Sequence, residues 1–279
     1  MQKFIGCSGT SYDSAEIVLF GAGFDGTTSY RPGARFGGSV IREQSFGLET
    51  YSPVLDRDLM DVKICDIGEL ELPFGNTQKT LEIIRETAER ILSDGKKLFM
   101  LGGEHLVTYP VIQACSALHP DLHIVHFDAH TDLRDDYCGE KLSHACVMRR
   151  CHELIGDNRI YSHGIRSGTR EEYRWAGGKV EINRTDFFEC ENLRSVFGDK
   201  PVYITVDIDV LDPSEFPATG TPEAGGMRYS KLHGYLKRLC RELNVIGADI
   251  VEFSPPYDHS GFCAATAGKL LREMLLMIR

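Results

Sequence analysis

Histidines are unevenly distributed in this 279-residue chain, because eight of the ten lie between His105 and His163. Imidazole is both a frequent metal ligand and a frequent acid–base group, so such clustering favours a chemical site. Within this window, GGEH (102–105) directly follows an apolar run at 98–101, and DAHTD (128–132) directly follows another at 123–127. A third motif, DID (207–209), follows the apolar run 202–206. Short apolar runs of this kind are typical of buried strands, so three motifs are predicted at three strand ends.

The spacing within these motifs predicts that their side chains converge. Alternate residues of an extended segment point the same way, so Asp128, His130 and Asp132 should share one side, as should Asp207 and Asp209. Each motif alone has a plainer interpretation, because a DxD is often a helix N-cap or a solvated loop, and a lone histidine is often only hydrogen-bonded. The three motifs together favour one shared site.

Metal binding is the chemistry that this set of residues favours. Neighbouring carboxylates at the apolar end of a strand repel each other and lose solvation, and a cation resolves that conflict. The two histidines and four aspartates are too many for one ion and suit two ions with bridging carboxylates; they are His105, Asp128, His130, Asp132, Asp207 and Asp209. An oxygen-rich set with some imidazole suits manganese ahead of iron, cobalt or zinc. The absence of cysteine from the motifs argues against a structural zinc site.

The elements that must position these motifs alternate between strands and helices. Apolar runs predict buried strands at 17–21, 98–101, 123–127, 160–165, 202–206 and 245–251. Helical periodicity predicts helices over Thr77–Ser93, with Thr77 as N-cap and Gly95 just past the end, and over 186–197, 230–243 and 264–278. This alternation predicts an α/β fold, a three-layer α/β/α arrangement with a mostly parallel central sheet. No linker divides the chain, so residues 1–279 are expected to form a single domain.

Composition excludes several classes of protein. Hydrophobic residues at 42% and charged residues at 26% are typical of a globular chain and not of a disordered one. A net charge of −10 argues against a nucleic-acid partner. Nine cysteines without a CxxC pair are expected to be reduced thiols. The N-terminus lacks a signal-peptide pattern and no long apolar run occurs, so we expect a soluble cytoplasmic protein without a membrane partner.

These motifs make the chain resemble the ureohydrolase family (arginase, agmatinase and relatives), manganese enzymes that release urea from guanidino compounds. The resemblance covers nearly the whole chain and depends on GGEH, DAHTD and DIDVLDPSEFPATGTPEAGG (207–226). It implies an arginase-like fold, two Mn²⁺ per chain and a homotrimer or homohexamer. It also implies the ligands of each ion, with Asp128 and Asp207 bridging: His105, Asp128, Asp132 and Asp207 for one, and Asp128, His130, Asp207 and Asp209 for the other.

The resemblance implies three catalytic residues as well. His144, in Ser143-His144-Ala145, corresponds to a histidine assigned to proton shuttling. Glu252, at the end of the predicted strand 245–251, corresponds to the glutamate that binds the substrate guanidinium. A carboxylate suits that planar cation because it can accept two N–H bonds at once. Asp132 would protonate the leaving amine, whereas Glu104 is expected to be structural.

Within the family, the sequence leans toward the agmatinase branch. The loops SYRPGARFGG (29–38) and TGTPEAGG (219–226) resemble that branch. Arginases carry an Asn after DAHxD and an Asp after GLR, whereas this chain has Arg134 and Ser167, so the anionic partner for an α-ammonium is missing. We therefore expect agmatine to be cleaved to putrescine and urea.

Three kinds of alternative stay open on the sequence alone. The first is another ureohydrolase, acting on guanidinobutyrate, guanidinopropionate, formiminoglutamate or arginine. The second is an amide-cleaving metal hydrolase, since deacetylases of related fold share metal sites at strand ends. The third is a non-catalytic regulator that retains the fold.

Overall fold

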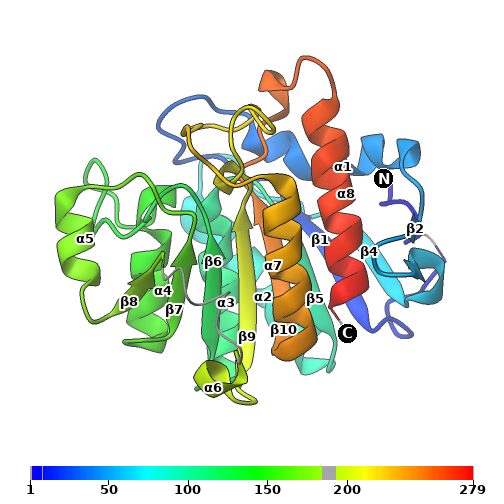
Figure 1. The fold of residues 1–279 in the computed structure, drawn as a ribbon, viewed down its shortest axis with the longest axis horizontal. Coiled ribbons are helices and arrows are strands. Elements are labelled where there is room, and N and C mark those ends of the chain that lie inside the picture. The colour runs from blue at the N-terminus through cyan, green and yellow to red at the C-terminus, as the bar shows by residue number, and fades with distance from the viewer. Residues whose placement is uncertain (1, 8, 184–192, 279) are drawn as a thin grey trace.

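A parallel β-sheet of eight strands runs through the middle of the molecule (Figure 1). The computed structural model describes residues 2–7, 9–183 and 193–278. The strand order is β4-β1-β5-β10-β9-β6-β7-β8, and every described pairing within this sheet is parallel. The strands are β1 (Ile17–Ala22), β4 (Ile64–Glu69), β5 (Lys97–Gly102), β6 (His123–Phe127), β7 (Ile160–His163), β8 (Val180–Ile182), β9 (Pro201–Asp207) and β10 (Asn244–Val251). A short antiparallel pair, β2 (Tyr51–Ser52) and β3 (Arg57–Asp58), is separate.

Helices cover both faces of the sheet (Figure 1). One face packs against α1 (Gly37–Gln44), α7 (Tyr229–Glu242) and α8 (Phe262–Met277), and the other against α2 (Thr77–Ser93), α3 (Thr108–Leu118) and α4 (Val147–Ile155). Side chains alternate along each strand, so Phe99 and Leu101 join the first core while Leu98 and Met100 join the second. Two shorter helices are α5 (Arg170–Ala176) and α6 (Arg194–Phe197). The three-layer α/β/α arrangement with a parallel sheet is therefore confirmed.

The strands with continuous apolar runs lie where the sequence predicts them, within a residue or two of their ends. The run 160–165 is too long, because β7 ends at His163. β4 has no such run, because it is an edge strand whose residues are alternately buried and half-buried. Its alternating pattern explains why a search for continuous apolar runs misses it.

The predicted helices are confirmed for α2, α7 and α8, with one correction at a cap. Asn76, and not Thr77, is the N-cap of α2, because its side-chain oxygen accepts a hydrogen bond from the N–H of Lys79 at 3.0 Å. Gly95 follows the helix end with a φ of 70°, as its position suggests. Of the helix expected over 186–197, α6 covers Arg194–Phe197, and residues 184–192 lie outside the described residues.

Two expectations from composition concern the described part of the chain. Its eight cysteines are all free thiols. None of the helices described is both long enough and apolar enough to cross a membrane.

The sheet order brings the sequence motifs together. β5, β10, β9 and β6 are neighbours at the centre of the sheet, and their carboxyl ends lie along one edge. GGEH follows β5, Glu252 follows β10, Asp207 ends β9, and DAHTD follows β6. Segments that are far apart in the chain therefore meet at the edge where parallel α/β sheets place their ligands.

A buried ion network ties helix α1 to the edge strand β4. Arg42 is 2% exposed and binds Asp66 through two nitrogens, at 2.8 and 3.0 Å, and also contacts Glu69. Removing one partner from such a network leaves the other charges buried and unpaired.

We predict that Arg42→Ala lowers the free energy of unfolding by about 3–5 kcal/mol. Lys63→Ala is the matched control, because it removes an exposed ion pair with Glu16 and should cost at most about 1 kcal/mol. Urea unfolding monitored by circular dichroism measures both. Equal midpoints for the two variants would contradict a stabilising role for Arg42.

Candidate metal centre

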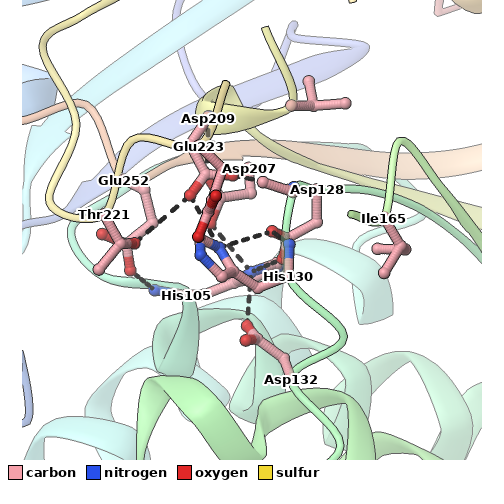
Figure 2. A network of polar contacts seen from close by, with 12 residues as sticks. His105, Asp128, His130, Asp132, Ile165, Asp207, Asp209, Thr221, Glu223 and Glu252 are labelled. Atoms are coloured by element: carbon pink, nitrogen blue, oxygen red, sulfur yellow. Dashed lines mark hydrogen bonds and ion pairs between the residues drawn. The ribbon is translucent and has the colours of Figure 1, made fainter. Parts of the chain in front are cut away.

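His105 lies at the centre of the converging side chains (Figure 2). It begins a short 3₁₀ turn (His105–Val107) directly after β5 and is fully buried. Its Nδ1 lies 3.1 Å from Asp128 Oδ2, 3.2 Å from Asp132 Oδ2 and 3.4 Å from Asp207 Oδ2. Yet this nitrogen forms no hydrogen bond. Buried ring nitrogens normally have a partner, so a bare nitrogen that faces three carboxylates is what a metal ligand presents.

The second histidine, His130, shares one of these carboxylates, that of Asp128, and also faces Asp209. Its Nδ1 lies 3.0 Å from Asp209 Oδ2 and 3.5 Å from Asp128 Oδ1. Asp128 therefore turns one oxygen toward His105 and the other toward His130. The ligand atoms of Asp128, His130 and Asp209 all lie within 4.8 Å of one another, which is compatible with one shared ion. This position suits the bridging role expected of Asp128, and the bridging roles of Asp128 and Asp207 both stay predictions.

Backbone N–H groups fix the orientation of these carboxylates. Asp128 Oδ1 accepts from the N–H of His130 at 2.6 Å, Asp207 Oδ1 from that of Asp209 at 2.9 Å, and Asp209 Oδ1 from that of Ala129 at 3.0 Å. The expectation of plain extended segments is wrong here. The residues after Asp207 form a 3₁₀ turn (Ile208–Val210), and Asp132 has a left-handed backbone with a φ of 51°. The side chains converge because the turns redirect them.

The charges of this cluster are costly without cations. Burial and the neighbouring carboxylates of Asp209 and Asp128 raise the pKa of Asp207 well above its usual value. Burial and Asp128 raise the pKa of Asp132 to about 7. Divalent cations would restore the ionised forms. Carboxylate oxygens suit manganese, and imidazole nitrogens are common ligands of first-row divalent metals. This donor set therefore fits the two expected manganese ions.

A cavity of about 270 Å³ opens beside the cluster. His130, Asp132, Asp207 and Glu252 are among the residues that line it. Glu252 is 7% exposed, has a left-handed φ of 66°, and accepts the N–H of His105 at 2.8 Å. Burial and nearby Glu104 raise the pKa of Glu252 well above its usual value. A cation in the cavity would favour the ionised carboxylate of Glu252, and that carboxylate would in turn stabilise the cation.

His144 lines the same cavity from the 3₁₀ turn His144–Cys146. Its Nε2 lies 3.3 Å from Ser29 Oγ, and its Nδ1 lies 3.5 Å from Thr27 Oγ1. Burial lowers the pKa of His144 to about 4, so the imidazole is neutral at neutral pH. A neutral imidazole between hydroxyls can accept a proton and pass it on.

Glu104 supports this side of the cavity. Its fully buried carboxylate accepts hydrogen bonds from Thr27 N, Thr27 Oγ1 and Thr28 Oγ1. Thr27 Oγ1 also accepts from the backbone N–H of His144 at 3.1 Å. Glu104 therefore holds the Thr27 loop beside His144, in agreement with the structural role expected of it.

Two side chains at the site, His126 and Glu172, were not predicted from the sequence. His126 is buried, with Nε2 2.8 Å from Asp128 Oδ2 and Nδ1 2.9 Å from Ser162 Oγ. Since both nitrogens have partners, His126 is placed to orient Asp128, and its position two residues before Asp128 was the available signal. Glu172 lines the cavity and accepts from Thr131 Oγ1 at 2.6 Å. It belongs to a capping box with Thr169 at the start of α5, a pattern that the sequence contains.

Arg134 and Ser167, the positions where the sequence departs from arginases, both line the cavity. The guanidinium of Arg134 lies over the Tyr137 ring at 4.8 Å, and its Nε is 3.9 Å from Glu172 Oε2. Both positions therefore belong to the lining of the cavity that opens beside the cluster.

Comparisons with known proteins agree with this geometry. The chain matches the model of the arginase family over residues 15–277. It is 51% identical over 269 residues to the agmatinase of Bacillus subtilis, covering 95% of this chain and 92% of that protein. It is 39% identical over 279 residues to a human mitochondrial guanidino acid hydrolase, covering 95% and 79% of the two chains.

A solved structure has the same fold. The agmatine ureohydrolase of Thermoplasma volcanium superimposes with a TM-score of 0.90 at 35% identity, covering 99% of this chain and 94% of that one. The chain therefore belongs to the arginase family and is an enzyme that acts on guanidino compounds.

Proposed function

We propose that this enzyme hydrolyses agmatine to putrescine and urea with two manganese ions. The charge of the cavity carries the choice of substrate. Besides three of the candidate ligands, His130, Asp132 and Asp207, its lining has the buried carboxylates of Glu172 and Glu252 against one guanidinium, that of Arg134. Agmatine has a guanidinium at one end and an ammonium at the other, so a cavity with excess negative charge suits it. The similarity to the Bacillus subtilis agmatinase supports this choice.

Six residues would hold the ions: His105, Asp128, His130, Asp132, Asp207 and Asp209. Their oxygen-rich composition with two imidazoles favours manganese. When bound, two neighbouring divalent cations lower the pKa of water enough to supply hydroxide near neutral pH.

The chain itself supplies binding, orientation and proton transfer. Glu252 accepts N–H bonds from the guanidinium and holds it at the inner end of the cavity, which provides orientation for attack. Asp132, which lines the same cavity, would accept the proton of the attacking hydroxide and pass it to the leaving amine. His144, which lies between the hydroxyls of Thr27 and Ser29, passes protons between the cavity and solvent.

Guanidino acids are the second candidate substrates. Arg134 lines the cavity and could bind a carboxylate at the substrate tail, and the human relative is a guanidino acid hydrolase. The 3.9 Å approach of Arg134 to Glu172 argues for agmatine, because the guanidinium already has an anionic partner. Membership of the arginase family argues against the amide-cleaving and non-catalytic alternatives.

We predict that kcat/KM for agmatine exceeds that for arginine by at least roughly a hundredfold. Arginine adds a carboxylate beside its α-ammonium, and a half-buried charge without a partner costs a few kcal/mol, at about 1.4 kcal/mol per tenfold. Urea release from agmatine, arginine and guanidinobutyrate, at one manganese concentration, measures the order. Arginine equal to agmatine would refute the agmatinase assignment.

Arg134→Gln separates the two candidate substrates in the same assay. If agmatine is the substrate, this variant retains agmatine turnover, because it removes no group that binds an ammonium. If a guanidino acid is the substrate instead, the parent enzyme shows little activity on agmatine. The Arg134→Gln variant then loses turnover of guanidinobutyrate.

We predict that Asp209→Asn lowers manganese content and turnover together. The amide keeps an oxygen for the N–H of Ala129 but loses the ligand charge, so the fold should persist. Substituting a residue that only hydrogen-bonds to a metal ligand typically lowers activity by roughly 10–100-fold. We expect a larger loss of turnover for Asp209→Asn, because it changes a ligand itself. Metal analysis after gel filtration measures occupancy, with Asp121→Asn as an exposed control. Full occupancy with normal turnover would exclude Asp209 from the ligand set.

We predict that His144→Ala retains both ions but lowers kcat by about 10²–10⁴-fold, the usual contribution of a positioned acid–base group. Small imidazole buffers should restore part of the rate. Metal analysis and steady-state kinetics test this together. Loss of manganese along with activity would show that His144 supports the metal centre and does not relay protons.

A further inference from the structure

Asp249 is a buried carboxylate that the proposed mechanism does not use. It lies in β10, is 0% exposed, and its hydrogen bonds come from three hydroxyl groups. Oδ1 accepts from Thr205 Oγ1 at 2.6 Å, and Oδ2 accepts from Thr108 Oγ1 and the Tyr203 hydroxyl, each at 2.9 Å. Burying a carboxylate among neutral groups is costly, so this position calls for a reason.

One of the three hydroxyls connects Asp249 to the metal centre. Thr205 is the cross-strand partner of Asp249 in β9, and its Oγ1 lies 3.0 Å from His105 Nε2. A hydroxyl has a single hydrogen to donate, and Thr205 donates it to the ionised carboxylate of Asp249. The oxygen of Thr205 must then accept a hydrogen bond from His105, which fixes the hydrogen of the neutral imidazole on Nε2.

That tautomer leaves the lone pair of His105 on Nδ1. Nδ1 is the atom that faces Asp128, Asp132 and Asp207 without a hydrogen bond. If Thr205 instead donated its hydroxyl hydrogen to Nε2, the neutral imidazole would carry its own hydrogen on Nδ1. That hydrogen would point at the three carboxylates. Such a hydrogen occupies the position that a metal ion needs.

We propose that Asp249 is a positioning residue that acts through Thr205 to hold His105 in its metal-binding tautomer. The inference rests on the role of His105 as a ligand in the proposed function. Thr108 and Tyr203 hold the other carboxylate oxygen, which leaves Oδ1 directed at Thr205. Thr108 Oγ1 also lies 3.5 Å from Thr205 Oγ1, whereas the Tyr203 hydroxyl contacts Asp249 without contacting Thr205, so Tyr203 offers the matched control.

The test is titration of the metal-stripped full chain with Mn²⁺, measured by calorimetry. Asp249→Asn and Thr205→Val should each weaken the affinity for one of the two ions by about 10–100-fold. An amide at 249 can donate to Thr205 and so release its proton toward His105, and valine removes the hydroxyl. Thr205→Ser keeps the hydroxyl and should bind as the parent does. Tyr203→Phe removes one hydrogen bond to Asp249 without touching Thr205, and should also leave the affinity unchanged.

Three outcomes overturn the inference. If Asp249→Asn and Thr205→Val bind Mn²⁺ as tightly as the parent while His105→Ala loses an ion, the positioning role is wrong and the ligand role of His105 stands. If His105→Ala keeps both affinities, the ligand assignment fails and the inference fails with it. Should Asp249→Asn not fold, the Thr205→Val and Thr205→Ser pair carries the test. A lower unfolding midpoint for Thr205→Val without weaker binding would then show a purely structural role.

Discussion

Mutual repulsion among buried carboxylates is the constraint on which the rest of this structure depends. Asp128, Asp132, Asp207 and Asp209 are each at most 7% exposed, and His105 and His130 bring them into one cluster. Like charges in such surroundings are tolerated only with cations between them and with hydrogen bonds behind them. The parallel sheet provides the rigid part of this arrangement, because its four central strands end at the same edge.

Support for the cluster comes from two different sources. Behind the candidate ligands, strand residues hold them in place: His126 contacts Asp128, and Thr205 contacts His105. Around the cavity, loop residues provide the support. Glu104, for example, holds the Thr27 segment beside His144 through hydrogen bonds. Strand positions change little when sequences diverge, whereas loops tolerate change. Under the proposed function, this division lets a shared centre be combined with different cavities, as relatives named agmatinase and guanidino acid hydrolase would need.

The sequence predicts those parts of the fold and the site that have a local signal. Buried strands such as β6 and β9 are continuous apolar runs, and the carboxylates that follow them identify a strand-end site. β4 is not predicted, because an edge strand is only half buried and has no continuous apolar run. Asn76 is not predicted as the N-cap of α2, because several residue types cap helices equally well. Asp132 and Glu252 show the other limit, since their left-handed backbones depend on tertiary contacts. The roles of Glu172 and Asp249 are likewise invisible until distant segments meet.

The position of β10 has a consequence for how the protein is made. It is the last strand along the described chain, yet it lies between β5 and β9 at the centre of the sheet. His105 after β5 can meet Asp207 of β9 in the native geometry only once β10 separates and aligns their strands. A nascent chain without β10 would therefore hold the candidate ligands without the strand order that brings them together. The proposed metal binding would follow completion of the sheet, because partial chains would keep these acidic residues apart.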